Sequence, residues 1–170
     1  TTPLGKNTRY SNPDSLREVW NDLGEFSRRV LKHGGYLLAY SGQQFGYLAE
    51  TCLREHLDYY WKITVAYGSS QSQLFRKKIR NRAKQILVFS KGIGRDHEWF
   101  FDLLHGGGKG EKEIHEWAQP ESEASCLIRK FTKPNEIVVD PLCGSGSTLK
   151  AALNLRRRAV GFEIDPERFR

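Results

Sequence analysis

The sequence lacks the features that mark several specialised classes of protein. It contains three cysteines, Cys52, Cys126 and Cys143, which lie far apart and form no CxxC pair. Neither a disulfide framework nor a zinc site is therefore indicated, and we expect no bound metal. No apolar run approaches the roughly 20 residues that cross a bilayer, and no charged-then-apolar signal order opens the chain. These absences predict a cytoplasmic protein that does not enter a membrane.

Methionine is absent as well, and the chain opens directly at Thr1. We expect a processed chain or a fragment. The chain nevertheless has 170 residues, of which 38% are hydrophobic and 12% aromatic. A chain of this length can bury about 70% of the surface that it exposes when unfolded. The composition therefore predicts one globular domain and excludes an ordinary disordered tail.

The hydrophobic pattern indicates helices that alternate with strands. Apolar residues at spacings of three and four predict helices over 16–31, 45–53, 121–131 and 147–155. Short buried strands are predicted over 36–40, 59–67, 85–89, 137–140 and 159–163. The glycine-rich segment 92–114 predicts a flexible surface loop around a short apolar turn. Strands that alternate with helices predict an α/β fold with a parallel sheet.

The strongest local feature is a strand, a glycine loop, a helix and a second strand that leads to a carboxylate. Gly144 and Gly146 allow the backbone to approach a ligand, and the amides at the start of the next helix can donate to an anionic group. Glu163 follows Gly144 by 19 residues, where an acid can accept from both hydroxyls of a ribose. Together with Asp140, this spacing predicts a nucleoside-binding crevice. The alternative is a GSGS turn that merely joins a strand to a helix.

The cofactor is not predicted to be a dinucleotide. A dinucleotide fingerprint has a third glycine where Leu149 stands, and no Gly-Lys-Ser/Thr of a Walker loop is present. Only seven residues follow Glu163, so the other strands of the sheet come from sequence before the loop. A nicotinamide domain begins with its glycine loop, whereas this chain ends with it, so a small oxidoreductase is a distant alternative.

The run HEWAQPESEASCLIRKFTKPNEIVVDPLCGSGSTLKAALNLRRRAVGFEIDPERF closely resembles the C-terminal half of amino-group-specific DNA methyltransferases of the permuted (beta) order, especially phage and plasmid members. The segments DLGEFSRRVLKHGGYLLAYSGQ and NRAKQILVFSKG extend the resemblance over roughly residues 15–170. It implies a three-layer α/β/α, Rossmann-like domain that uses S-adenosylmethionine to methylate exocyclic amines of adenine or cytosine in double-stranded DNA. Within a single domain of residues 1–170, 1–91 would form the substrate half and 115–170 the cofactor half.

The resemblance also implies roles for individual residues. The cofactor's methionine and sugar end would be lined by Asp140, Cys143, Gly144 and Gly146, and Glu163 would hold the ribose. A family segment that closes over the methionine part matches His115, Gln119, Glu121 and Ser122. The alternative for these four residues is that they cap the next helix.

The sequence departs from the family at the catalytic loop, which reads Asp/Asn/Ser-Pro-Pro-Tyr/Phe/Trp. The nearest match consists of Thr1, Thr2, Pro3 and Leu4. Thr1 cannot accept a hydrogen bond as a carboxylate does, and Leu4 has no ring to stack on a base. The strand that leads into this loop in the family has no counterpart here. We therefore expect either an N-terminally truncated enzyme or, alternatively, an inactive methyltransferase-like module that binds nucleic acid.

Two further patterns bear on the chemistry. A cytosine carbon-5 mechanism needs a Pro-Cys nucleophile, whereas Cys143 lies inside the cofactor loop, so that mechanism is excluded. Six cations occur within nine residues that contain no acid, namely Arg76, Lys77, Lys78, Arg80, Arg82 and Lys84. They nearly match the net charge of +7 and predict a phosphate-contacting patch, the alternative being a solvated face. The family often has basic residues at the helix-to-strand turn that matches 156–158, so the resemblance implies that this run makes no DNA contact.

Overall fold

The computed structural model describes residues 13–68, 72–74, 77–106 and 121–165. The chain forms two compact units. The first unit consists of residues 1–96 and 101–105, and the second of residues 97–100 and 106–170. No helix in the described part of the chain is long and apolar enough to cross a membrane.

The first unit contains a four-stranded sheet. Its strands are β1 (Tyr36–Ser41), β2 (Asp58–Tyr67), β5 (Ala83–Ser90) and β6 (Leu103–Gly106), in the order β1-β5-β2-β6. Strand β5 runs antiparallel to both β1 and β2, so the expectation of a parallel sheet is wrong here. The physical reason is the connection: β2 and β5 are joined through a hairpin, whereas parallel neighbours need a long crossover.

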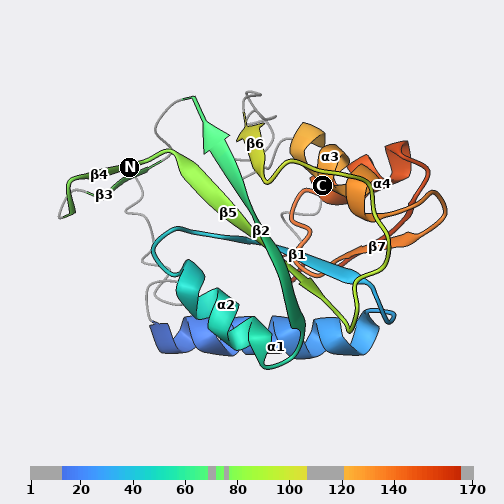
Figure 1. Ribbon diagram of the computed structural model, residues 1–170, viewed down its shortest axis with the longest axis horizontal. Helices are drawn as coiled ribbons and strands as arrows, with labels where there is room; N and C mark the ends of the chain where they lie inside the picture. Colours follow the sequence, from blue (N-terminus) through green and yellow to red (C-terminus); the bar gives the residue numbers. More distant parts are fainter. Residues whose placement is uncertain (1–12, 69–71, 75–76, 107–120, 166–170) are drawn as a thin grey trace. The chain divides into compact units, whose positions relative to one another are not determined.

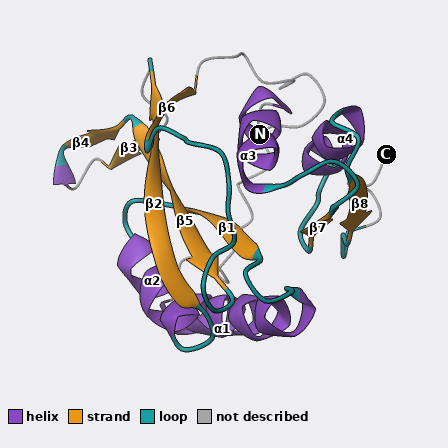
Figure 2. Ribbon diagram, turned by 45° about the vertical axis from the view of Figure 1, so that its right-hand side comes forward, coloured by secondary structure: helices purple, strands orange, loops and turns teal. Residues whose placement is uncertain are grey.

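The core of this unit is built around β5. Its residues 86–89 are fully buried, as expected for a central strand with an unbroken apolar run. Helices α1 (Pro13–Val30) and α2 (Gly46–Arg54) lie together against this sheet (Figures 1 and 2). Their apolar side chains pack with Leu87 and Phe89 of β5. The sequence-predicted helices and strands of this unit are confirmed with small shifts of their ends.

Two features of the first unit were not predicted. Strands β3 (Ser72–Leu74) and β4 (Ile79–Asn81) form a small antiparallel hairpin within the polar, basic stretch. Strand β6 lies inside segment 92–114, for which the sequence predicts only a loop, and Thr64 of β2 donates its backbone N–H to the Asp102 carbonyl at 2.7 Å. These strands are three or four residues long, so they carry too few residues for a periodic pattern.

The second unit has a parallel sheet of two strands. Strand β7 (Ile137–Asp140) pairs with β8 (Arg158–Gly161), and α4 (Ser147–Asn154) connects them. Helix α3 (Glu121–Phe131) packs beside α4 through Ile128, Ala151 and Ala152, with Val138 and Ala159 of the strands against them. This strand-helix-strand arrangement confirms the predicted elements and brings the ends of β7 and β8 together.

Candidate functional site

The candidate site lies at the carboxyl ends of β7 and β8. The register pairs Asp140 with Gly161, the last residues of the two strands. The Phe162 N–H then donates to the Asp140 carbonyl at 3.0 Å, and the Cys143 N–H donates to the Phe162 carbonyl at 2.9 Å. The loop after β7 is therefore held against the residues that follow β8. Ligands bind in such crevices outside the carboxyl ends of parallel strands.

Glu163 is held in place by the glycine loop. Its Oε2 accepts a hydrogen bond from the Gly144 N–H at 2.9 Å, and its Oε1 accepts one from the Asp165 N–H at 2.9 Å. Gly144 and Gly146 have φ values of +50° and +79°, which favour glycine. The sequence spacing thus correctly brings Gly144 and Glu163 together. Both carboxylate oxygens of Glu163 are thereby fixed beside the glycine loop.

The loop leaves space where a ligand would approach. A Cβ added at Gly144 or Gly146 would meet no other atom closer than 3.9 Å, so packing does not require glycine at either position. Asp140 orients the loop from the other side, because its Oδ1 accepts the Leu142 N–H at 3.1 Å. The backbone surface of the loop is accordingly accessible, and the residues fit a sugar or another polar group placed between the glycines and Glu163.

Cys143 is part of the packing beneath the loop. Burial raises the pKa of its thiol, and the negative charges of Asp140 and Glu163 raise it further. The thiol therefore stays protonated and does not act as a nucleophile at neutral pH. This finding supports the sequence-based exclusion of a carbon-5 mechanism.

Gly161 was missed by sequence reasoning. A Cβ at this position would lie 2.5 Å from Leu149 Cδ1 and 2.9 Å from Cys143 Sγ. Glycine as the last residue of β8 lets α4 and the loop pack against the strand without displacing these side chains. A glycine at the end of a strand that leads to the acidic residue is the sequence signal that could have indicated this.

Within the basic run 156–158, Arg157 is anchored inside the second unit, whereas Arg156 and Arg158 are exposed. Arg157 is buried, and its guanidinium donates to the Thr132 carbonyl at 2.6 Å, to Thr132 Oγ1 at 3.0 Å and to the Leu155 carbonyl at 2.7 Å. Arg158 also donates to the Asn135 carbonyl, at 3.2 Å. These bonds give both side chains a structural role, and the absence of DNA contact by this run stays a prediction.

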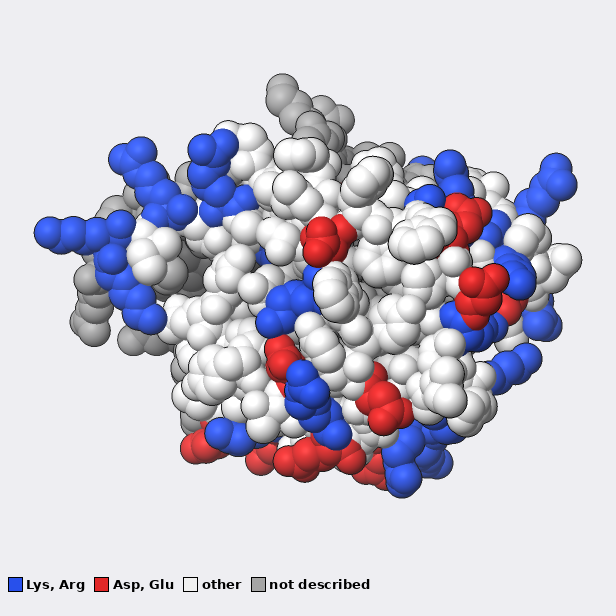
Figure 3. Space-filling model, viewed as in Figure 1, with Lys and Arg blue, Asp and Glu red and all other residues white. Residues whose placement is uncertain are grey.

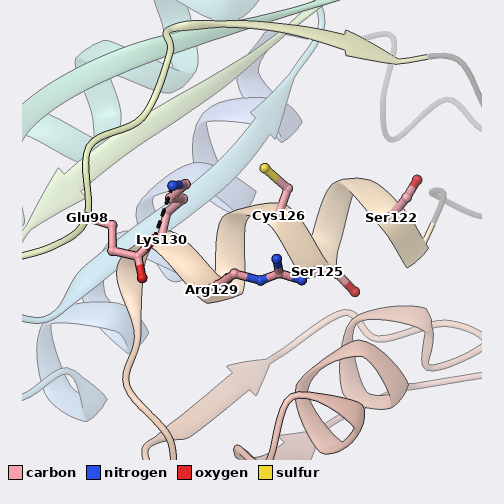
Figure 4. Close-up of a pocket in the computed structure, with 6 residues that line it drawn as sticks. All are labelled: Glu98, Ser122, Ser125, Cys126, Arg129 and Lys130. Atoms are coloured by element: carbon pink, nitrogen blue, oxygen red, sulfur yellow. Dashed lines mark hydrogen bonds and ion pairs between the residues drawn. The ribbon is translucent and has the colours of Figure 1, made fainter.

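Ser122 lies in a different place from the glycine loop. It lines a pocket of about 420 Å³ on α3 together with Glu98, Ser125, Cys126, Arg129 and Lys130 (Figure 4). Lys130 closes one side through an ion pair with Glu98 at 3.1 Å. The lining contains none of the loop residues, so the structure brings Asp140, Cys143, the two glycines and Glu163 together without Ser122. Outside the described residues lie His115, Gln119 and the candidate catalytic residues Thr1, Thr2, Pro3 and Leu4.

The predicted phosphate-contacting residues lie on and below the β3–β4 hairpin. Lys77, Lys78 and Arg80 are exposed, and Figure 3 shows Lys and Arg side chains gathered there at the left of the view. Arg82 and Lys84 stand at the base of the hairpin, and Arg76 lies outside the described residues.

Solved DNA methyltransferases share this fold. The chain is similar to M1.HpyAVI in its complex with SAM, with a TM-score of 0.77 and 19% identity over 93% of this chain and 81% of that one. It is also similar to the cytosine-N4-specific PvuII DNA methyltransferase, with a TM-score of 0.80 and 16% identity over 92% of this chain and 68% of that one. The Rossmann-like methyltransferase fold expected from the sequence is confirmed.

Sequence comparisons show to which family of methyltransferases the chain belongs. The type II methyltransferase M.MjaI of Methanocaldococcus jannaschii is 39% identical over 62 residues, which are 33% of this chain and 20% of the relative. The chain spans about a fifth of the length of the curated relatives it matches. The DNA methylase family N6_N4_Mtase matches residues 7–170, and the chain belongs to this family.

Proposed function

We propose that the chain binds S-adenosylmethionine at the loop between β7 and α4 and transfers its methyl group to an exocyclic amine of adenine or cytosine in double-stranded DNA. The observation that carries this proposal is the Glu163 carboxylate, which bridges the N–H groups of Gly144 and Asp165 at 2.9 Å each. Family membership and the SAM complex of M1.HpyAVI support the choice of cofactor. Because DNA is the proposed substrate, we also propose that the chain acts in the cytoplasm.

The loop residues and Glu163 have different roles in binding the cofactor. The oxygens of Glu163 accept from the hydroxyls of the ribose, while their bonds to backbone N–H groups keep the carboxylate in one orientation. Gly144 and Gly146 keep side chains out of the space in front of the loop. Asp140 fixes the first turn of the loop through the Leu142 N–H. When bound, S-adenosylmethionine supplies an electrophilic methyl group.

The second half of the reaction requires a positioned amine. An amine on an aromatic base is a poor nucleophile, so holding its nitrogen in line with the methyl group supplies much of the rate. The base must leave the helical stack to reach the site. Thr1-Thr2-Pro3-Leu4 is the nearest match in the sequence to the family's catalytic loop, and it has neither the carboxylate acceptor nor the stacking ring. We therefore propose that turnover by this chain is slow.

Nucleoside analysis tests the proposal. The 170-residue chain is incubated with S-adenosylmethionine carrying a labelled methyl group and with DNA that lacks methylation, and the DNA is digested for mass spectrometry. We expect labelled N6-methyladenine or N4-methylcytosine. Labelled 5-methylcytosine contradicts the proposed reaction. Binding of both cofactor and DNA with no labelled nucleoside contradicts the enzyme and favours the inactive binding module.

A variant tests the role of the first four residues. Thr1→Asp, Thr2→Pro and Leu4→Tyr together restore the family's loop around Pro3. Because an oriented acceptor is typically worth about a hundredfold to a thousandfold in rate, we expect a large gain in turnover. Equal turnover by the variant and the natural sequence contradicts the assignment of these positions to catalysis.

A further inference from the structure

The β3–β4 hairpin is a slender, cationic extension of the first unit. Both ribbon views show it projecting beyond the end of the sheet at which β2 stops and β5 begins (Figures 1 and 2). Its register pairs Ser72 with Asn81 and Leu74 with Ile79. From residue 72 to residue 84 the sequence contains no acid. The hairpin therefore presents positive charge at Lys77 and Lys78 in its turn and at Arg80 on β4, and no other described strand pairs with β3 or β4.

Arg82 fastens the base of this hairpin to β2. Its backbone carbonyl accepts the Tyr67 N–H at 2.8 Å, and its guanidinium donates to the Tyr67 carbonyl at 3.3 Å and to the Gly68 carbonyl at 2.5 Å. On the neighbouring side, Asn81 Oδ1 accepts the Ala83 N–H at 3.1 Å and fixes the turn between β4 and β5. The direction in which the hairpin leaves the sheet is thus set by side-chain bonds at its base.

The described cations between residues 76 and 84 fall into two groups. The outer group, Lys77, Lys78 and Arg80, is exposed on the hairpin beside the half-exposed Ile79. The inner group is Arg82, bonded to backbone carbonyls, and Lys84, whose Nζ lies 5.8 Å from the ring centroid of Tyr67. If the cations only faced solvent, the bonds of Arg82 that hold the hairpin to β2 would serve no purpose in binding. The arrangement instead separates residues that can reach a partner from residues that hold them in position.

We propose that the β3–β4 hairpin is a two-stranded ribbon that enters the major groove of DNA, with Arg82 as its positioning residue. This inference rests on the proposed DNA substrate. The major groove of undistorted DNA, about 12 Å wide, admits a two-stranded ribbon, whereas the minor groove is only about 6 Å wide and would have to be widened first. Lys77 and Lys78 contact phosphates, and Arg80 reaches the floor of the groove. Fixing the ribbon before binding lowers the ordering cost of association.

Duplex binding measured over a series of salt concentrations tests the outer group. Lys77→Ala/Lys78→Ala/Arg80→Ala should flatten the log-log salt slope by up to about 3 units, because each neutralised phosphate contributes about 0.9. The matched control, Arg28→Ala/Arg29→Ala/Lys32→Ala, removes three exposed cations from the same unit and should leave the slope near that of the natural sequence. Equal slopes for the natural sequence and the outer variant overturn the ribbon.

A second arm identifies the groove. Methyl green, which occupies the major groove, should displace the protein from the duplex, whereas netropsin, which occupies the minor groove, should not. The reverse result overturns the assignment to the major groove. If the natural sequence binds no duplex at any salt concentration, both the proposed DNA substrate and the ribbon are refuted. If it binds duplex and the hairpin variants bind equally well with the same salt slope, only the ribbon is refuted.

Arg82→Lys tests the positioning role. Lysine keeps the charge but cannot reproduce the fork to two carbonyls, whereas a simple phosphate contact tolerates the exchange. We expect binding about five- to tenfold weaker at every salt concentration, as for the loss of one ordinary hydrogen bond, with the salt slope unchanged. Amide exchange should accelerate at Tyr67 and stay slow in β5, and cofactor affinity should not change. Duplex affinity equal to that of the natural sequence overturns the role of Arg82.

Discussion

Glu163 is expected to couple the shape of the glycine loop to cofactor affinity. Glu163→Ala removes both acceptors and leaves the N–H groups of Gly144 and Asp165 to water. Glu163→Gln keeps the length of the side chain but replaces one acceptor oxygen by an NH₂ donor, which faces one of these two N–H groups. The alanine variant therefore loses two bonds to the backbone, and the glutamine variant loses one.

The magnitude follows from the chemistry of these bonds. Hydrogen bonds to charged groups contribute about 1.5–3 kcal/mol, and the half-buried position of Glu163 places its contribution toward the lower end. We expect Glu163→Ala to weaken binding of S-adenosylmethionine or S-adenosylhomocysteine by about 1–3 kcal/mol, roughly fivefold to 150-fold in Kd. Glu163→Gln should fall between the natural sequence and the alanine variant. Isothermal titration calorimetry measures all three.

Glu136→Gln is the matched control. Glu136 Oε2 accepts the Lys133 N–H at 2.7 Å, so this variant perturbs the same kind of bond in the same unit at a distance from the loop. It should lower the free energy of unfolding and leave the Kd for the cofactor unchanged. Unchanged affinity in Glu163→Ala, or an equal loss in Glu136→Gln, would refute the reasoning.

Three further predictions concern stability. Gly161→Ala should lower the free energy of unfolding by about 1–3 kcal/mol in urea titrations, because its Cβ would lie 2.5 Å from Leu149 Cδ1; an unchanged midpoint contradicts this tight packing. Arg157→Leu should lower the free energy of unfolding by about 1–3 kcal/mol, because half-buried carbonyls such as that of Thr132 lose their donor. The salt slope of DNA binding should not change, and a flatter slope would place Arg157 on DNA. Burial raises the pKa of Tyr36 from 10.0 to about 12, so the unfolded chain loses the phenol proton at lower pH than the folded chain. The free energy of unfolding should therefore fall as pH rises from 10 to 12. Tyr36→Phe should make this fall shallower, and an equally steep fall in the variant contradicts the assignment.

The sequence predicted best what depends on local pattern. The β7-α4-β8 unit and the proximity of Gly144 to Glu163 follow from hydrophobic periodicity and from the way a strand-helix-strand unit aligns strand ends. The direction of β5 was missed because pairing direction depends on the length of the connection. Gly161 was missed, and Arg82 was predicted to contact phosphate without its bonds to the end of β2, because both constraints come from contacts with residues distant in sequence, Leu149 and Tyr67.

The most direct test of the cofactor site is a titration of the isotope-labelled chain with S-adenosylmethionine, followed by amide ¹⁵N NMR spectra. We predict saturable shifts at Gly144, Gly146, Glu163 and Asp165, where the loop meets the carboxylate. Shifts confined to the α3 pocket around Ser122 and Arg129, or no saturable shift at the loop, would contradict the account.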